Sequence, residues 1–196
     1  MQSFPLDEFI ERYGIDEDHP TLLLYEHLRA TAPTRGATLA GGAVRALVQG
    51  LPVTTDYDLF FSDIDAFNRT AEYFDGRAEL IIETDHHRTY MYDGKKVQLI
   101  KIAFYTNTEA LLDSFDYTIC QLALRDGALH LGNYTLYDIG RKRLCVHKIT
   151  YGVASMRRLL KYASQGFTAC SGTYKALLDA AITNPDVVRS DVQYVD

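Results

Sequence analysis

Two aspartates separated by a single residue, Asp56 and Asp58, are the side chains of this 196-residue sequence best suited to chemistry. The segment TDYDLFF alternates in polarity, so an extended strand places both carboxylates on one face, with their Cα atoms roughly 7 Å apart. Carboxylates at this spacing can converge on one or two Mg²⁺ ions, and paired ions stabilise the attacking and leaving oxygens of a phosphoryl transfer. We therefore expect Asp56 and Asp58 to bind metal.

A glycine pair, Gly41-Gly42, precedes the two aspartates. Without side chains, these residues let a phosphate approach the backbone, and the helix that follows presents free N–H groups and its positive end. A glycine pair alone is typical of a tight turn, and a DxD strand alone is typical of a solvated face. Their combination in this order favours a site for a phosphate-bearing ligand.

The elements that must position these residues follow from periodicity and from helix-capping residues. Asp18 is expected to cap a helix that has Pro20 in its first turn, and Asp116 is expected to begin another helix. The remaining expected strands are 37–42, 55–61, 78–84, 88–92, 96–104 and short strands within 128–139, and the remaining expected helices are 43–50, 63–74, one from about 108, 152–165 and 172–183.

The stretch from Leu39 to Phe61 resembles the head-domain motif of the DNA polymerase β-like nucleotidyltransferases, and within them the class II tRNA nucleotidyltransferases and bacterial poly(A) polymerases. The family pattern GGxVRDxLLGxxxxDxD corresponds here to GGAVRALVQG followed by Asp56-Tyr57-Asp58. Two further blocks agree in order: DYTICQLA at 116–123 is similar to RRDFTINALA, and RLLKYASQGF at 158–167 is similar to the end of the neck helix, RAxRFxxQLGF.

The resemblance implies an α+β head, a mixed sheet with flanking helices, followed by a short helical neck. We expect an N-terminal helical segment packed on the head at 1–36, the catalytic head at 37–149, and the neck with a C-terminal tail at 150–196. By the same resemblance Gly41 and Gly42 hold a triphosphate, Asp56 and Asp58 hold Mg²⁺ or Mn²⁺, and Arg45 lies near the phosphates or braces its helix through a salt bridge. The implied reaction transfers a nucleoside monophosphate from an NTP to a hydroxyl and releases pyrophosphate.

Departures from the family pattern concern the third acidic position. The family carries a carboxylate on a strand similar to EVTTFR, where this sequence has Gln98. A glutamine positions a water or hydroxyl by hydrogen bonds but does not accept its proton at neutral pH. Either Asp116 compensates, or catalysis depends on Asp56 and Asp58 alone, or activity is lost; Asp116 is also interpreted as a helix N-cap.

The neck departs as well. The positions of the family's base-selecting EDxxR motif fall at Tyr151, Gly152 and Ser155, so CCA addition is not implied. The neck cations Arg157, Arg158 and Lys161 remain, and they either neutralise a triphosphate or RNA backbone or form a solvated helix face. An RNA 3′ end, of tRNA or another small RNA, is the acceptor that the resemblance favours, and a protein or small-molecule acceptor stays open.

Charge is distributed unevenly along this acidic chain. The formal net charge is −6, yet residues 139–178 hold eight Lys and Arg and no acid. This distribution argues against a uniformly basic nucleic-acid coat protein and favours a confined phosphate-binding region. It does not indicate an oligomeric state.

Cysteine content and hydropathy bear on the compartment. The three cysteines, Cys120, Cys145 and Cys170, are widely spaced and contain no CxxC pair, which is typical of a reducing compartment. We find no export signal and no apolar run of membrane-spanning length, so we expect a cytoplasmic protein without a membrane partner.

The cluster Asp85-His86-His87-Arg88 is interpreted as a loop or strand edge, because adjacent histidines on a strand point to opposite faces.

The alternative to an enzyme is a catalytically silent nucleotide- or RNA-binding module, which the substitution at Gln98 favours.

Overall fold

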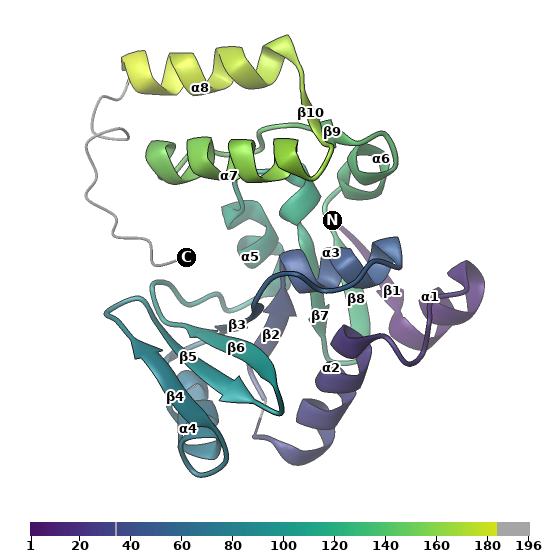
Figure 1. Ribbon diagram of the computed structural model, residues 1–196, viewed down its shortest axis with the longest axis vertical. Coiled ribbons are helices and arrows are strands. Elements are labelled where there is room, and N and C mark those ends of the chain that lie inside the picture. The colour runs from purple at the N-terminus through teal and green to yellow at the C-terminus, as the bar shows by residue number, and fades with distance from the viewer. Residues whose placement is uncertain (34, 184–196) are drawn as a thin grey trace. The chain divides into compact units, whose positions relative to one another are not determined.

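The computed structural model describes residues 1–33 and 35–183, which form two compact units (Figure 1). Within the described residues, the first unit comprises Met1–Leu112 and Leu122–Leu131, and the second comprises Asp113–Gln121 and 132–183.

The first unit contains eight strands and most of the helices. Its elements are β1 (Gln2–Pro5), α1 (Leu6–Tyr13), α2 (Pro20–Thr31), β2 (Ala37–Ala40), α3 (Gly42–Gln49), β3 (Tyr57–Phe61), α4 (Ile64–Asp75), β4 (Glu79–Glu83), β5 (His87–Tyr92), β6 (Lys95–Ile100), α5 (Thr108–Ser114), whose last residues belong to the second unit, β7 (Leu122–Arg125) and β8 (Ala128–Leu131).

All eight strands join one mixed sheet in the order β1-β8-β7-β2-β3-β6-β5-β4. Only β3 and β6 pair in parallel, and the other neighbours are antiparallel. The mixed sheet with flanking helices confirms the α+β fold expected from the sequence.

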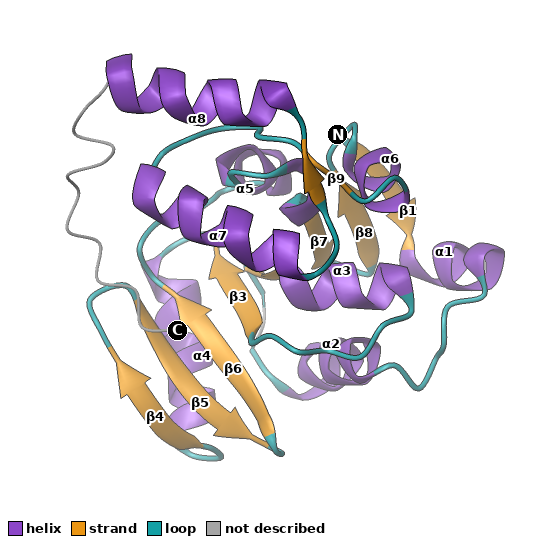
Figure 2. Cartoon of the chain, turned by 45° about the horizontal axis from the view of Figure 1, so that its top comes forward, coloured by secondary structure: helices purple, strands orange, loops and turns teal. Residues whose placement is uncertain are grey.

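Helix α4 covers one face of the β3-β6-β5-β4 part of this sheet (Figure 2). It begins where Asp63 Oδ1 accepts a hydrogen bond from Ala66 N at 2.8 Å, which satisfies one of the free N–H groups of its first turn. Phe67 of α4 meets Phe61 of β3 edge to face, with ring centroids 5.4 Å apart. Because side chains alternate along a strand, residues one position from Phe61 point away from α4.

The second unit consists of the 3₁₀ helix η1 (Thr118–Cys120), α6 (Thr135–Gly140), β9 (Arg143–Leu144), α7 (Gly152–Ser164), β10 (Thr168–Ala169) and α8 (Ser171–Thr183). Strands β9 and β10 form a short parallel pair. Helix α7 buries Leu159 and Tyr162 along one side, and the Tyr162 ring packs edge-on against Tyr117, with centroids 5.7 Å apart.

The prediction that a helix begins at Asp116 is wrong. Asp116 caps no helix: only the single 3₁₀ turn η1 follows it, with Tyr117 as the flanking residue, and the chain then enters β7. Thr118 Oγ1 donates a hydrogen bond to Asp138 Oδ2 at 2.6 Å, and the Asp116 carboxylate is engaged elsewhere. These long-range bonds, together with pairing of β7 between β2 and β8, outweigh the local helical preference.

Three smaller differences concern local signals. The cap of α2 is His19, whose Nδ1 accepts from Thr21 N at 3.2 Å, and not Asp18. The segment after β8 forms helix α6, where strands were expected. Strand β1, which pairs with β8, had no sequence signal because it is short and lies at the sheet edge. None of the helices within residues 1–33 and 35–183 has the length and apolar composition that a membrane crossing requires.

Candidate functional site

The turn between β2 and α3 has a backbone that only glycine adopts easily. Gly41 has φ 79° and ψ −132°, and its N–H donates to the Leu122 carbonyl of β7 at 2.9 Å. At Gly42 an added Cβ would lie 2.7 Å from Cγ2 of Thr55, which is closer than side-chain atoms approach. Both glycines are therefore required by this turn, in which Gly41 is buried and Gly42 is half-buried.

Asp58 lies inside the sheet, flanked by two specific neighbours. In register it pairs with Ala40 at the end of β2 and with Gln98 of the parallel strand β6. Asp56 directly precedes β3, and both aspartates are half-buried. Of the two register partners of Asp58, Ala40 is apolar and Gln98 is polar.

Gln98 continues a polar row across a third strand. Its Nε2 donates to Thr89 Oγ1 of β5 at 3.2 Å, and Thr89 is its register partner. Asp58, Gln98 and Thr89 thus occupy matching positions on β3, β6 and β5. The opposite face is the one that α4 covers, since Tyr90, one residue from Thr89, packs on Phe74 of α4 with centroids 5.3 Å apart.

His87 joins the same face, because it lies two residues from Thr89 on β5. Its Nδ1 lies 3.2 Å from Thr84 Oγ1, while its Nε2 is buried and has no hydrogen-bond partner within the part of the chain that the structure describes. Burial lowers the pKa of His87, His86 and Lys101 lower it further, and the Asp56 carboxylate opposes this shift. The interpretation of His87 as a loop or edge residue was wrong, because His87 belongs to β5, which lies between β6 and β4. The alternating pattern of HRTYMY is the signal that could have predicted this strand.

The donor set fits Mg²⁺ only in part. Asp56 and Asp58 supply the oxygen ligands that Mg²⁺ prefers. The position that a Cβ of Gly42 would take is closed by Thr55, so the glycine turn leaves no extra room there. Across the described residues no three His, Cys, Asp or Glu side chains gather as a metal site. Two carboxylates suit an ion that takes its other ligands from phosphate oxygens and water.

Arg45 lies in α3, the helix that follows the glycine turn. Its residue is only 7% exposed, and its N–H donates to the Gly41 carbonyl at 3.0 Å. The Arg45 side chain is therefore largely enclosed by protein, and its role, near phosphates or bracing its helix, stays a prediction.

In the second unit, Asp116 is 7% exposed and accepts two hydrogen bonds from α7. Arg158 Nη1 donates at 2.8 Å and Ser155 Oγ at 3.1 Å, both to Oδ2. The Tyr117 hydroxyl donates to the Ser155 carbonyl at 2.7 Å. Asp116 therefore ties the segment before η1 to α7 by hydrogen bonds to Arg158 and Ser155. We call these three residues the Asp116 bracket.

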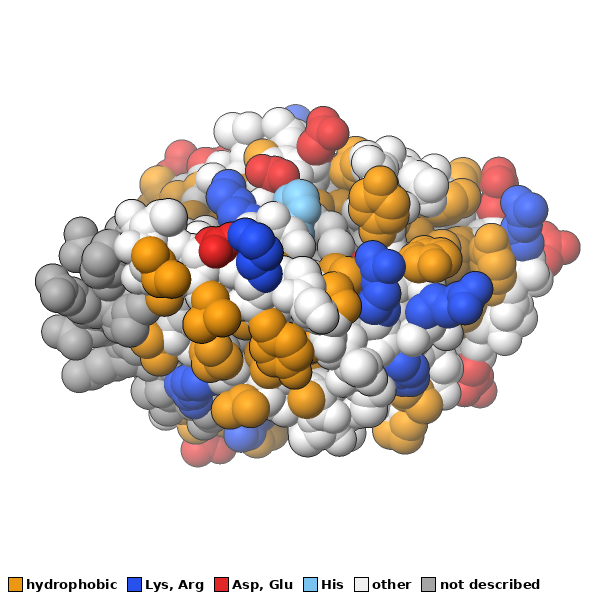
Figure 3. Space-filling model, turned by 90° about the horizontal axis from the view of Figure 1, so that it is seen from above, with side chains coloured by type: hydrophobic (Ala, Val, Ile, Leu, Met, Phe, Trp, Pro, Cys, Tyr) orange, Lys and Arg blue, Asp and Glu red, His pale blue; other side chains and the backbone are white. Residues whose placement is uncertain are grey.

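Arg157 and Lys161 lie on the exposed side of α7. Figure 3 looks down on the side that carries α8, and Lys and Arg side chains lie there among apolar ones. The exposed apolar residues of the two helices include Met156, Leu160 and Leu178. Of the three neck cations, Arg158 belongs to the Asp116 bracket, whereas Arg157 and Lys161 do not.

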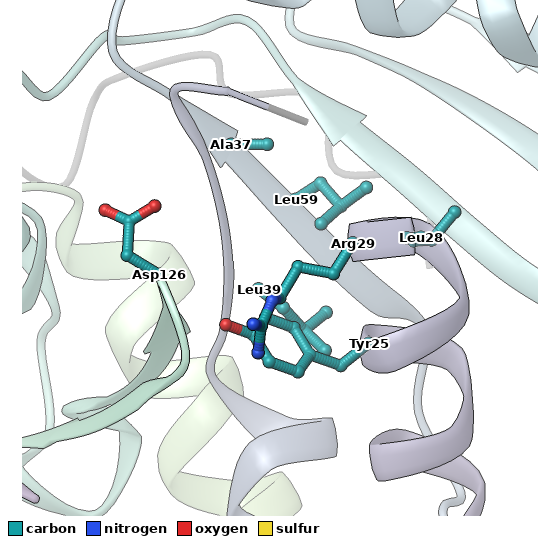
Figure 4. Close-up of a pocket in the computed structure, with 7 residues that line it drawn as sticks. All are labelled: Tyr25, Leu28, Arg29, Ala37, Leu39, Leu59 and Asp126. Atoms are coloured by element: carbon teal, nitrogen blue, oxygen red, sulfur yellow. The ribbon is translucent and has the colours of Figure 1, made fainter. Parts of the chain in front are cut away.

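A small pocket of the first unit lies apart from this polar row (Figure 4). It is lined by Tyr25, Leu28, Arg29, Ala37, Leu39, Leu59 and Asp126. Leu59 is one residue from Asp58, so it points to the opposite face of the sheet. The Tyr25 hydroxyl accepts from Gly127 N at 2.8 Å, which ties α2 to the β7–β8 turn beside this pocket.

The mixed sheet and its flanking helices form a fold that is shared with solved CCA-adding enzymes. The chain is similar to the Thermotoga maritima CCA-adding enzyme complexed with tRNA, with a TM-score of 0.68 and 16% identity over 93% of this chain and 47% of that chain. It is also similar to the Bacillus stearothermophilus CCA-adding enzyme in complex with CTP, with a TM-score of 0.62 and 18% identity over 85% of this chain and 44% of that chain. The fold predicted from the sequence motifs is thereby confirmed.

The chain belongs to the Gabija anti-defense 2 family, whose sequence profile matches residues 5–142. A curated relative, "Gabija anti-defense 2" of Bacillus phage SPbetaL7, is 24% identical over 160 residues. This match covers 80% of the chain but 40% of the relative, so the chain spans less than half the length of the proteins that it resembles.

Proposed function

We propose that this chain is a metal-dependent nucleotidyltransferase that transfers a nucleoside monophosphate from an NTP to a hydroxyl acceptor. The observation that carries the proposal is the placement of Asp58 next to Gln98 in register, on the sheet face opposite α4. The Gly41-Gly42 turn ends the neighbouring strand β2, so a phosphate-approach turn and the carboxylates belong to adjacent strands.

In this proposal each residue has a distinct role. Asp56 and Asp58 hold Mg²⁺ or Mn²⁺, which neutralises phosphate charge and activates the acceptor oxygen when bound. Gly41 and Gly42 admit the phosphates to the backbone N–H groups at the start of α3. Gln98 and Asp116 are the candidates for the third participant. Gln98 orients an acceptor hydroxyl or water by hydrogen bonding, whereas Asp116 is already bonded to Arg158 and Ser155.

The acceptor that we propose is an RNA 3′ end. The CCA-adding enzymes of similar fold are described in complexes with tRNA, CTP and ATP. The cations Arg157 and Lys161 of α7 supply contacts suited to a phosphate backbone or to the triphosphate, with Arg158 and Arg45 in bracing roles. We place this activity in the cytoplasm, where NTP and RNA are available.

The relative's name adds a biological setting for this chemistry. That phage protein is called an anti-defense protein, directed against Gabija. We propose that nucleotidyl transfer by this chain serves the same purpose, by modifying an RNA, a nucleotide or a protein on which the defence depends.

A second function is favoured by Gln98. Because a glutamine stands where the fold family carries a carboxylate, a module that binds a nucleotide without reacting would retain the same row of residues. Such a module would counter the defence by sequestering nucleotide or RNA.

Labelled NTPs distinguish the two functions. The protein is incubated with each α-labelled NTP, Mg²⁺ or Mn²⁺, and total RNA, and the label is followed into RNA, protein and small molecules. We expect incorporation that Asp58→Asn and Asp56→Asn abolish and that Asp65→Asn, an exposed carboxylate in the first turn of α4, leaves unchanged. Measurable NTP binding without incorporation would support the silent module.

A phage assay tests the biological setting. The chain, the Asp58→Asn variant and the Asp65→Asn control are expressed in bacteria that carry Gabija, which are then infected. Recovery of phage growth by the wild type and the control, but not by Asp58→Asn, is the expected result. Equal recovery with Asp58→Asn would show that catalysis is unnecessary.

A further inference from the structure

Cys145 and Cys170, far apart in sequence, lie next to each other in the second unit. Strands β9 and β10 are parallel, with Arg143 opposite Thr168 and Leu144 opposite Ala169. Cys145 directly follows β9 and Cys170 directly follows β10, the parallel strands labelled in Figure 1. The charge of Cys170 acts on the pKa of Cys145, which places the two residues close together. Neighbouring strands lie about 4.8 Å apart, within the Cα separation of about 4.4 to 6.8 Å that a disulfide requires.

The two thiols have different surroundings. Cys170 is exposed and directly precedes α8, a helix of 13 residues. Hydrogen bonds from Thr173 and from the Gly172 backbone lower the pKa of Cys170, and the Arg143 charge lowers it further. Cys145 is half-buried, and burial together with the Asp138 charge raises its pKa.

We propose that Cys145 and Cys170 form a peroxide-sensitive dithiol, in which Cys170 reacts first and Cys145 then closes a disulfide with it. The site needs no partner protein, because one unit supplies both sulfurs, the helix start and Arg143. The proposal is independent of nucleotidyl transfer.

The chemistry balances with hydrogen peroxide as the oxidant. The Cys170 thiolate attacks one peroxide oxygen, an S–O bond forms, the O–O bond breaks, and the departing hydroxide takes a proton to leave as water. The Cys145 sulfur then attacks the Cys170 sulfenic acid, the S–O bond breaks, and a second water leaves with the Cys145 proton. In total the two sulfurs lose two electrons to the peroxide, and an external dithiol reverses the disulfide.

The disulfide would close a loop around α7. Positions 145 and 170 are 25 residues apart, and α7 with Arg157 and Lys161 lies between them. Closing this loop restricts the separation of β9 from β10 when the segment opens. Oxidation is therefore expected to slow amide hydrogen exchange at β9, β10 and the start of α8.

The third cysteine provides an internal reference. Cys120 is 4% exposed, and its thiol donates to the Tyr162 hydroxyl at 3.0 Å. A peroxide-accessible reaction should therefore leave Cys120 as a free thiol.

The experiment treats the reduced full chain with hydrogen peroxide and follows intact mass and peptide maps. We expect a loss of about 2 Da, a Cys145–Cys170 crosslinked peptide and an unmodified Cys120. In Cys145→Ser the reaction should stop at a sulfenic acid on Cys170, a gain of about 16 Da that dimedone traps. Cys170→Ser should consume peroxide roughly tenfold more slowly than the wild type.

Contrary results are equally definite. Over-oxidation of Cys170 in the wild type while Cys145 remains a thiol, or dimers linked through Cys170, would overturn the proposal. So would equal reactivity of the wild type and Cys170→Ser. The wild-type peptide map uses the unsubstituted protein. Its result therefore tests the proposal even if a variant fails to fold.

Discussion

Asp116 and Arg158 form an ion pair with Nη1 and Oδ2 2.8 Å apart, and the Asp116 side chain is 8% exposed while that of Arg158 is 41% exposed. The pair joins the segment before η1 to the middle of α7, across 42 residues of sequence. Arg158 is therefore engaged within the second unit by Asp116, and Arg157 and Lys161 are the exposed cations of α7.

The first prediction concerns the stability of this bracket. Asp116→Asn should lower the free energy of unfolding by about 2 kcal/mol, because it removes a charge-assisted bond from a buried carboxylate. Asp113→Asn, at an exposed carboxylate that pairs with His147, should change it by less than about 0.5 kcal/mol. Denaturant unfolding of Asp116→Asn, Arg158→Gln and the double variant measures the coupling, and additive effects would show that the pair contributes nothing.

The second prediction concerns Gln98. Gln98→Glu places a third carboxylate beside Asp58, so the apparent affinity for Mn²⁺ should rise about tenfold, since ligand charge tunes affinity. Gln98→Met, which keeps the volume without charge, should leave metal affinity unchanged. Calorimetric titration with Mn²⁺ in the presence of NTP measures both; equal affinity in Gln98→Glu and wild type would place the metal away from β6.

The third prediction concerns the glycine turn. Gly42→Ala should destabilise the protein by about 2 kcal/mol, because the new Cβ meets Cγ2 of Thr55 at 2.7 Å. Thr55→Ser removes that methyl group, so adding it to Gly42→Ala should restore most of the stability. Thermal unfolding of the single and double variants decides the matter, and failure of Thr55→Ser to rescue would mean that another neighbouring group sets the requirement.

The fourth prediction concerns pH. Burial lowers the pKa of His87 below its ordinary value of 6.5, so the unfolded chain takes up a proton at a higher pH than the folded chain. This residue's contribution to stability is complete above pH 6.5 and declines as the pH falls through 6.5 toward the folded pKa. The loss of unfolding free energy between pH 7.5 and pH 5.5 should therefore be smaller in His87→Gln than in the wild type. An identical pH dependence in the wild type and in His87→Gln would show that burial does not lower the pKa of His87.

The fifth prediction concerns RNA binding by α7. Arg157→Gln and Lys161→Gln should each weaken single-stranded RNA binding and reduce the salt slope by about 0.7, the value expected when one fewer phosphate is neutralised. Lys175→Gln serves as the control, since Lys175 pairs with Asp179 on α8. Fluorescence titrations at several salt concentrations measure the slopes. An unchanged salt slope in both α7 variants would show that Arg157 and Lys161 form a solvated helix face and do not contact RNA phosphates.

Local patterns were sufficient for the first unit's central features. The alternation around Asp58 and the glycine pair before α3 predicted a strand, a turn and a helix, because period and turn chemistry are properties of a few adjacent residues. The order of three motif blocks predicted the nucleotidyltransferase fold, which the solved structures confirm. The roles of Asp56, Asp58 and the neck cations stay predictions.

Only the tertiary structure decided which distant residues meet. The sequence predicted a helix from Asp116, yet the Asp116 carboxylate bonds to α7, and its neighbours form η1 and β7. Likewise His87, interpreted as a loop or edge residue, shares a face with Thr89, and Cys145 and Cys170 directly follow the paired strands β9 and β10. Pairing between strands and burial of a charge depend on segments tens of residues apart, and no local period encodes those partners.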